Sequence, residues 1–155
     1  MARFAPAKRD VFDEFATEIL HNYAEGRWVV AVDGPEGSGQ SAVADGIAAS
    51  IEAQGTAAVR ASTDGVEDFR SQILEPFRAG SGNAILVVDG RGLLRPPLSS
   101  IFVYTIWIGV APDGAPEPTE GQRDYERTIR PRMAATANLN NSDPDHPRRT
   151  FSDSC

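Results

Sequence analysis

The sequence predicts a three-layer α/β fold with a mostly parallel sheet of about five strands. Two observations lead to this prediction. Short apolar runs alternate with amphipathic segments along the 155 residues, as they do where helices join parallel strands. A glycine-rich turn directly follows the first apolar run and precedes a helical pattern. The length suits a single domain over residues 1–155, large enough to bury a sizeable core.

The first half of the chain alternates helix and strand. Residues 8–25 predict an amphipathic N-terminal helix, because apolar side chains recur there at spacings of three and four. Residues 28–32 form an apolar run whose two faces both look buried, which is typical of a parallel sheet. Residues 40–53 follow as a helix and residues 57–61 as a second strand.

The second half continues the alternation and ends in a polar tail over residues 140–155. We expect Pro76 to disturb the last turn of one helix and Pro131 to break another, because proline lacks the backbone N–H. The elements expected here are a helix over 66–78, strands over 84–88 and 104–110, a partly helical charged segment over 120–134, and a short strand over 135–139.

Composition and charge exclude several classes of protein. A net charge of −7 argues against a nucleic-acid partner, which usually needs a basic face. No apolar run approaches the roughly 20 residues of a membrane-spanning helix, so we expect no membrane partner. The only cysteine, Cys155, cannot form a disulfide within the chain, and the N-terminus carries charges where a signal peptide needs an apolar core. These features predict a cytoplasmic protein.

The glycine-rich turn carries the clearest chemical signal. It matches the phosphate-binding pattern GxxxxGK[ST] at every fixed position except the lysine, where Gln40 stands. Glycines let successive backbone N–H groups point inward, and the following helix presents its positive end to phosphates. This P-loop therefore predicts nucleotide binding through Gly34, Pro35, Glu36, Gly37, Ser38, Gly39, Gln40 and Ser41.

Gln40 removes a positive charge from this loop. Its amide donates hydrogen bonds to a phosphate but brings no charge, and losing a charged transition-state contact costs roughly 3–4 kcal/mol. Lys8, at the start of the first helix, is the only lysine, so a substitute cation has to be one of the fourteen arginines. Two interpretations stay open: phosphoryl transfer is severely reduced or absent, or an arginine compensates.

Polar residues follow three of the predicted strands. Asp33, Asp64 and Asp89 stand where strands end, and ligands of parallel sheets bind beyond the carboxyl ends. Asp64 is a candidate general base, with a helix-capping acid as the alternative. Ser41 and Asp89 are candidates to hold Mg²⁺, with an ordinary turn aspartate as the alternative for Asp89.

The charged segment over residues 120–134 is a candidate lid. Arginine matches phosphate geometry well, and Arg127 and Arg130 are the first candidates to contact a moving phosphate. The alternative is a solvated face on which the arginines alternate with acids. The four arginines of the segment are Arg123, Arg127, Arg130 and Arg132.

In this order the motifs resemble the uridine kinase-like family of P-loop nucleoside kinases, especially short actinobacterial-type members. The resemblance covers residues 8–155 with a gap. It is carried by Val30–Gly39 as strand and loop, Val59–Asp64 as second strand with its acid, Leu86–Gly90 as third strand with its acid, Arg91–Pro96 as the turn after it, Asp124–Pro131 as lid, and Asn140–Arg149 as the segment beside the nucleotide base.

The resemblance implies ATP with Mg²⁺ and a nucleoside or other small-molecule acceptor, whose hydroxyl proton Asp64 would accept. It also implies that Asn141 and Asp143 lie beside the base. One departure concerns the acceptor: the family has a longer stretch after the second-strand acid, whereas Asp64-Gly65 here runs almost directly into the predicted helix. Much of the acceptor pocket is therefore expected to be missing.

Three functional hypotheses follow. The leading one is an ATP-binding protein that resembles uridine kinase but whose phosphoryl transfer is impaired by Gln40. The second is a pseudokinase that serves as an interaction or regulatory module, as a homodimer or with an unknown protein partner. The third is an active small-molecule kinase, an ATP-dependent phosphotransferase in which an arginine replaces the lysine.

Overall fold

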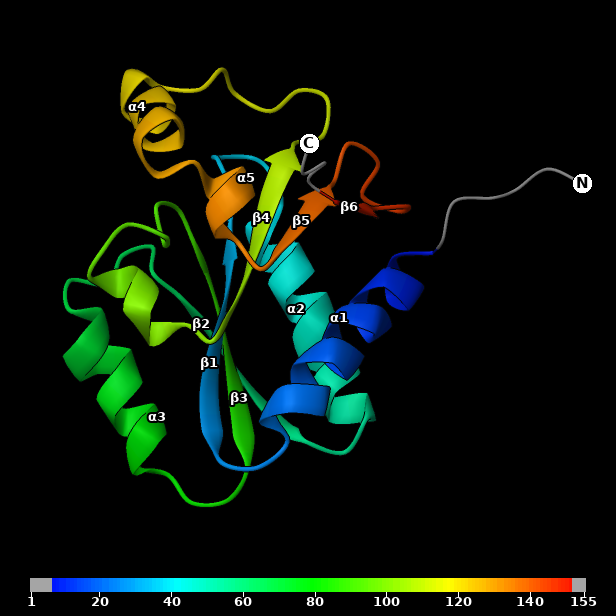
Figure 1. Ribbon diagram of the computed structural model, residues 1–155, viewed down its shortest axis with the longest axis vertical. Helices are drawn as coiled ribbons and strands as arrows, with labels where there is room; N and C mark the ends of the chain where they lie inside the picture. The colour runs from blue at the N-terminus through cyan, green and yellow to red at the C-terminus, as the bar shows by residue number, and fades with distance from the viewer. Residues whose placement is uncertain (1–6, 152–155) are drawn as a thin grey trace, which may run out of the picture.

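The computed structural model describes residues 7–151 and shows one sheet covered by helices on both faces (Figure 1). Cys155 lies outside the described residues. The strand order is β2-β3-β1-β4-β5-β6; β1 to β5 are parallel and β6 is antiparallel to β5. The strands are β1 (Arg27–Asp33), β2 (Ala57–Ser62), β3 (Ala84–Gly90), β4 (Tyr104–Val110), β5 (Ala137–Asn140) and β6 (Arg148–Thr150).

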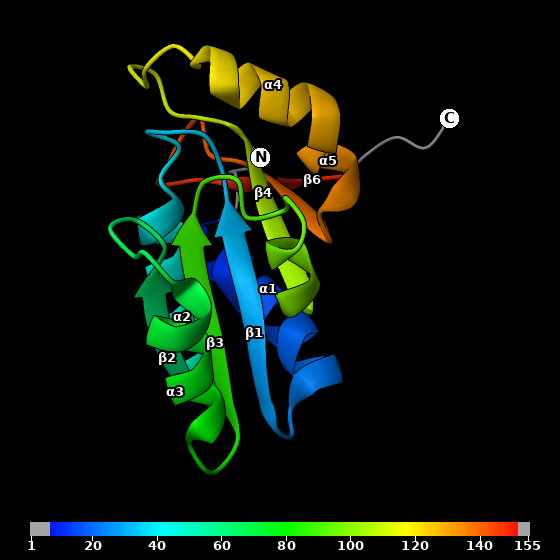
Figure 2. The same ribbon diagram turned by 90° about the vertical axis from the view of Figure 1, so that its left-hand side faces the viewer.

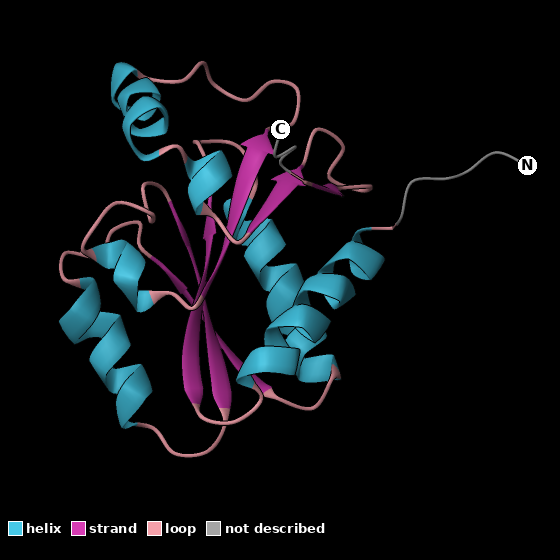
Figure 3. Cartoon of the chain, in the orientation of Figure 1, coloured by secondary structure: helices cyan, strands magenta, loops and turns pink. Residues whose placement is uncertain are grey.

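The helices divide between the two faces and the carboxyl end of the sheet. Helices α1 and α2 cover one face and α3 the other, while α4 crosses beyond the strand ends (Figure 2). Figure 3 shows the same three layers coloured by element type. The helices are α1 (Lys8–Tyr23), α2 (Gln40–Ala53), α3 (Glu75–Ala79), α4 (Glu120–Ile129) and α5 (Pro131–Ala134), with a π-helical turn η1 (Arg70–Leu74) and a 3₁₀ turn η2 (Leu98–Ile101).

The three-layer parallel α/β prediction is confirmed, with two differences in its elements. The sheet has six strands, because part of the expected polar tail forms the short β6. The helix expected over 66–78 does not include residues 66–68, and its first part is the π-helical turn η1. Within that turn the N–H of Glu75 bonds to the carbonyl of Arg70, immediately before Pro76, which has no N–H to donate.

The break expected near Pro131 is present and has a clear backbone cause. Arg130 adopts the left-handed region with φ of 55°, so α4 ends at Ile129 and α5 begins at Pro131. At the other end of α4, the hydroxyl of Thr119 accepts a hydrogen bond from the backbone N–H of Gln122 and caps the helix. The charged segment is therefore a capped helix followed by a sharp change of direction.

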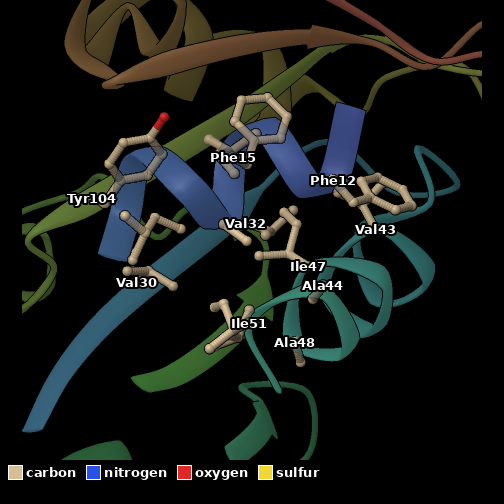
Figure 4. Close-up of a cluster of buried hydrophobic side chains, with 14 of the residues drawn as sticks. Phe12, Phe15, Val30, Val32, Val43, Ala44, Ile47, Ala48, Ile51 and Tyr104 are labelled. Carbon is tan, nitrogen blue, oxygen red and sulfur yellow. The ribbon is translucent and has the colours of Figure 1, made fainter. Parts of the chain in front are cut away.

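The main core lies between the sheet and the pair α1 and α2 (Figure 4). Phe15, Ile47 and Ile51 are fully buried there against the sheet. Gly46 of α2 leaves the space for the ring of Phe12, because a Cβ at this glycine would collide with Cδ2 and Cε2 of that ring. This close approach of α1 to α2 ties the N-terminal helix to the helix that follows the P-loop.

A smaller apolar cluster anchors the carboxyl end of the sheet. Leu94, Trp107 and Tyr125 are buried together, and the rings of Trp107 and Tyr125 lie 6.3 Å apart. Tyr125 belongs to α4, so this cluster holds the candidate lid over the strand ends. Among residues 7–151, none of the helices has the length and apolar character that crossing a membrane requires.

Candidate functional site

The P-loop joins the buried strand β1 to the N-terminus of α2. Gly37 and Gly39 adopt positive φ angles of 79° and 91°, which explains the need for glycine at these positions. Gly34 is required for another reason, since a Cβ there would collide with the hydroxyl of Ser38. Gly39, the residue before α2, has no side chain to cap the helix, and within residues 7–151 the first backbone N–H groups of α2 receive no capping side chain at this position. This is the backbone arrangement that binds a phosphate.

The loop is braced from the end of β5. The side-chain amide of Asn141 donates a 2.8 Å hydrogen bond to the carbonyl of Ser38, and Asn141 is itself buried. The hydroxyl of Ser38 is also buried and has no hydrogen-bond partner within residues 7–151, which leaves its bonding capacity unused. The structure therefore gives Asn141 a bracing contact that the sequence did not predict.

Gln40 turns its side chain back onto the loop. Its amide nitrogen donates a 2.7 Å hydrogen bond to the carbonyl of Gly34, the first residue of the P-loop. The residue in place of the lysine thus links the two ends of the loop. One of the two amide N–H bonds of Gln40 is used in this way, and the side chain adds no charge.

Asp33, directly before the loop, is a buried carboxyl group. The hydroxyl of Tyr125 donates a short hydrogen bond to its Oδ2, and the backbone N–H of Leu94 donates to that same hydroxyl at 3.0 Å. Desolvation by burial raises the pKa of Asp33 to about 6, although the bond from Tyr125 and nearby backbone amides counteract part of this rise. Its Oδ1 is buried and forms no well-aligned hydrogen bond with any residue from 7 to 151. Asp33 therefore links β1 to the candidate lid.

Asp89 forms an ion pair instead of facing an open space. Oδ1 lies 2.8 Å from Nη2 of Arg60, and the hydroxyl of Ser62 donates to Oδ2 at 3.3 Å. All five N–H groups of Arg60 are occupied, since they also bond to Asp45 Oδ1 and to three backbone carbonyls, those of Ser41, Ala61 and Val87. Arg60 is therefore a saturated internal cation with no free donor for a phosphate.

This pairing bears on the expected Mg²⁺ site. Asp89 is buried and both of its oxygens have partners within the protein, so its role as a metal-orienting acid stays a prediction. Ser41 is exposed at the start of α2 and fits better. In the described part of the chain, no group of three or more His, Cys, Asp or Glu side chains is placed to hold a metal ion.

Asp64 lies exposed in the turn after β2 and lines a cavity of about 390 Å³ beneath α4. Its backbone N–H bonds to the hydroxyl of Ser62 at 3.3 Å, which fixes the turn. The cavity adjoins the carboxyl ends of β2 and β3. Its lining residues are Thr63, Asp64, Arg91, Gly92, Arg95, Gly121, Gln122 and Tyr125.

The candidate lid arginines do not line this cavity. Arg127 forms a 2.9 Å ion pair with Asp124 on the same helix, and both side chains are exposed. Arg130 occupies the left-handed turn between α4 and α5. The role of Arg127 and Arg130 in contacting a phosphate stays a prediction, and the arginines that do line the cavity are Arg91 and Arg95.

A second, larger groove of about 470 Å³ runs between α1 and α2. Its walls include Phe12 and Val43, and Asn141 and Pro144 close the end nearest the P-loop. Asp143 is not among its lining residues; its carboxylate bonds to the backbone N–H of Asp145 at 3.2 Å and lies 3.2 Å from the ring of His146. Of the two residues expected beside a base, the structure thus places Asn141 on the groove and Asp143 in a local turn.

Three contacts of this site were not predicted from the sequence. Arg60 is a lone charge inside an apolar strand, a pattern that could have indicated a buried ion pair. Tyr125 is the aromatic residue of an otherwise charged helix, which could have indicated an anchor. The contact of Pro116 with the P-loop had no sequence signal, yet a Cβ at Gly37 would lie 2.7 Å from Cδ of that proline.

Comparisons with known proteins are informative at the level of structure. No protein-family model matches the chain, and no curated protein matches its sequence. A possible uridine kinase from Bacillus stearothermophilus is similar in structure, with a TM-score of 0.66 and 16% identity over 84% of this chain and 97% of that one. A candidate fructose transport system kinase from Silicibacter sp. TM1040 is similar at 0.47, with 18% identity over 64% of this chain and 74% of that one.

The first of these comparisons identifies the fold, since it spans nearly the whole of the other protein. The matched part covers 84% of this chain, whose sheet has six mostly parallel strands. The chain therefore has the same three-layer α/β fold as the possible uridine kinase from Bacillus stearothermophilus.

Proposed function

We propose that this chain binds a nucleotide, with ATP as the leading candidate, through the loop from Gly34 to Ser41. The single observation that supports this most is the geometry of the loop: glycines at positive φ lead into a helix whose first N–H groups lack a capping side chain. Asn141 braces the carbonyl of Ser38 from outside, so the loop is held in shape before any ligand arrives.

The nucleoside half of the ligand fits the groove between α1 and α2. Ala42 and Asn141 stand at its end near the P-loop, and small side chains of α2 leave the apolar wall open. A volume of about 470 Å³ lies in the range of small-molecule sites, which run from roughly 300 to 1,000 Å³. Phosphates on the loop and a base in this groove would therefore belong to one ligand.

We further propose that phosphoryl transfer is impaired. Gln40 carries no charge and its amide is bonded to Gly34, while Arg60 has used all of its donors. A transferred phosphoryl group needs positive charge that follows it in the transition state, and neither residue supplies it. Mg²⁺ bound with the nucleotide would supply charge of this kind; among the chain's own residues, Ser41 is the one that fits a metal ligand.

Two alternatives each have an observation in their favour. The pseudokinase hypothesis is favoured because the side chains of Gln40 and Asp89 form hydrogen bonds within the protein and do not require a ligand as a partner. The small-molecule kinase reading is favoured because Asp64, a candidate base, shares a cavity with two arginines. All three readings are compatible with a cytoplasmic protein, where ATP is available.

Calorimetric titration of the full chain with ATP, with Mg²⁺ and with EDTA, tests the leading proposal. Saturable binding at or below millimolar nucleotide supports it, and no binding under either condition overturns it. The variant Gln40→Lys then separates the alternatives. New ATP turnover in this variant indicates a site that lacks only the lysine, whereas neither binding nor turnover favours the interaction module.

A further inference from the structure

The cavity beneath α4 carries more positive charge than the rest of this acidic protein suggests. Arg91 and Arg95 both line it, against the single carboxylate of Asp64. The chain as a whole has a net charge of −7, so a cavity with two guanidinium groups has a local charge of the opposite sign to that of the protein. A cavity of this kind attracts small anions by local electrostatics.

The two arginines project from a turn that is firmly held. Leu93 and Leu94, which lie between them, are buried, with Leu93 fully so. The backbone N–H of Leu94 donates to the hydroxyl of Tyr125, and that hydroxyl donates in turn to Asp33. The backbone positions of Arg91 and Arg95 are therefore set by the core, which lowers the entropy lost on binding.

Both guanidinium groups remain available to a ligand. Arg91 faces Glu36 at 3.8 Å, at the edge of ion-pair distance, and both side chains are about half exposed or more. The Cζ atom of Arg95 lies over the ring of Tyr125, 5.4 Å from its centre, and within residues 7–151 its guanidinium forms no ion pair. Neither arginine is saturated as Arg60 is.

The remaining groups of the cavity select among anions. Asp64 would repel a purely anionic ligand but accepts a hydrogen bond from a hydroxyl. Gln122 of α4 and Thr63 add neutral polar groups to the lining. A small molecule suits both the positive arginines and the negative Asp64 if it has a carboxylate or phosphate at one end and hydroxyls at the other.

We propose that the cavity bounded by Asp64, Arg91 and Arg95 binds a small hydroxylated anion, with its acidic group on the two arginines and a hydroxyl toward Asp64. This inference rests on the proposed function, because it names the class of acceptor that would lie across from the P-loop nucleotide. It distinguishes this chain from a kinase whose acceptor is a neutral nucleoside.

Titration of the ¹⁵N-labelled full chain with D-glycerate, followed by backbone amide NMR shifts, tests the proposal. We expect saturable shifts at Gly92, Leu94 and Gly121, and none with glycerol at the same concentration. The double variant Arg91→Gln/Arg95→Gln should weaken glycerate binding at least about tenfold, since a hydrogen bond to a charged group is lost at each position. Arg78→Gln, which removes one positive charge from an exposed side chain of α3, should leave glycerate binding unchanged, whereas Arg91→Gln and Arg95→Gln should each weaken it.

Propionate, which has the same carboxylate without hydroxyls, tests the role of Asp64. We expect D-glycerate to bind at least about fivefold more tightly than propionate, and Asp64→Asn to reduce that ratio. Equal affinity for the two probes, shifts confined to residues 34–41, or equal weakening by Arg78→Gln would overturn the proposal. Inorganic phosphate serves as a second anion, and its shifts at 34–41 and at 91–95 report the two sites separately.

The same spectra separate this inference from the proposed function. ATP should shift the amides of Gly37 and Gly39, whereas D-glycerate should not. If ATP shifts no amide while glycerate shifts the cavity residues, nucleotide binding is wrong and the anion site stands. If ATP binds the loop and glycerate shifts nothing, the anion site is wrong and nucleotide binding stands.

Discussion

Tyr125 of α4 donates a hydrogen bond from its hydroxyl to the buried carboxylate of Asp33 at the end of β1. The two residues are 92 positions apart in the chain, and Asp33 directly precedes the P-loop. This contact fastens the candidate lid to the strand that carries the phosphate-binding turn. It also makes the position of α4 sensitive to a single phenol group.

Removal of that phenol hydroxyl should destabilise the protein. In Tyr125→Phe the carboxylate of Asp33 loses its donor and the N–H of Leu94 loses its acceptor, so we expect a loss of about 2–3 kcal/mol in unfolding free energy. Urea denaturation measures it. Tyr23→Phe is the matched control, because its hydroxyl makes one 3.3 Å bond to the carbonyl of Val103 and should matter less. Equal losses in the two variants would contradict the assigned role of Tyr125.

The raised pKa of Asp33 predicts an unusual dependence of stability on pH. Its pKa is about 6 in the folded protein against 3.8 for the ordinary group, so the folded state binds this proton more tightly than the unfolded state. Stability from this group is therefore greatest below about pH 4 and falls as pH rises to about 6, by roughly 3 kcal/mol. Asp33→Asn should remove that fall and be more stable than the parent at pH 8.

The effect of Asp33 on the pH dependence of stability must be separated from that of Glu18. The pKa of Glu18 is lowered, chiefly by its hydrogen bond from Arg149. Glu18 contributes stability that is lost as pH falls, which is the opposite sign. Subtracting the unfolding curves of Asp33→Asn from those of the parent at each pH cancels Glu18 and leaves Asp33. A difference that does not change between pH 4 and 6 would refute the raised pKa.

The Arg60–Asp89 pair predicts a large asymmetry between two similar substitutions. Arg60→Gln leaves the buried carboxylate of Asp89 without its cation and should cost about 2–4 kcal/mol. Asp45→Asn breaks the other ion pair of Arg60, at an exposed carboxylate, and should cost less than about 1 kcal/mol. The double variant Arg60→Gln/Asp89→Asn should recover part of the first loss, which a double-mutant cycle measures. Strict additivity would show that the two residues are not coupled.

Two helical glycines should respond in opposite directions to alanine. Gly46→Ala places a methyl group against the ring of Phe12 and should cost about 1–3 kcal/mol. Gly121 of α4 meets nothing closer than the Thr119 hydroxyl at 3.8 Å, so alanine there should stabilise the helix by up to about 1 kcal/mol. Thermal or urea unfolding of the two variants checks the sign. Stabilisation by Gly46→Ala would mean that α1 does not pack this closely on α2.

Local patterns in the sequence were sufficient for most of the fold. Helix 40–53 and strand 104–110 were predicted with the bounds that the structure has, because apolar spacing and flanking glycines are local signals. Strand β6 was not predicted, because its three residues are too few to show an alternating pattern in the polar tail. The predicted start of the next helix at residue 66 was also wrong. Val66 fits the apolar spacing of that helix, but it still belongs to the turn that follows Asp64.

For the candidate site, the sequence by itself determined the P-loop and the edge of the sheet where it lies. Glycine spacing and the order of strand, loop and helix are properties of consecutive residues, and they required no knowledge of distant contacts. The charge deficit at Gln40 was equally visible, because it is a matter of residue type.

Only the tertiary structure decided what the strand-end acids do. Asp33 is bonded to Tyr125, Asp89 is paired with Arg60 29 positions away, and Asp64 alone faces a cavity. The physical reason is that a carboxylate's role depends on its desolvation and on the donors within hydrogen-bond distance. Those donors come from β2 and α4, so their positions follow from packing of the whole chain and from no local pattern.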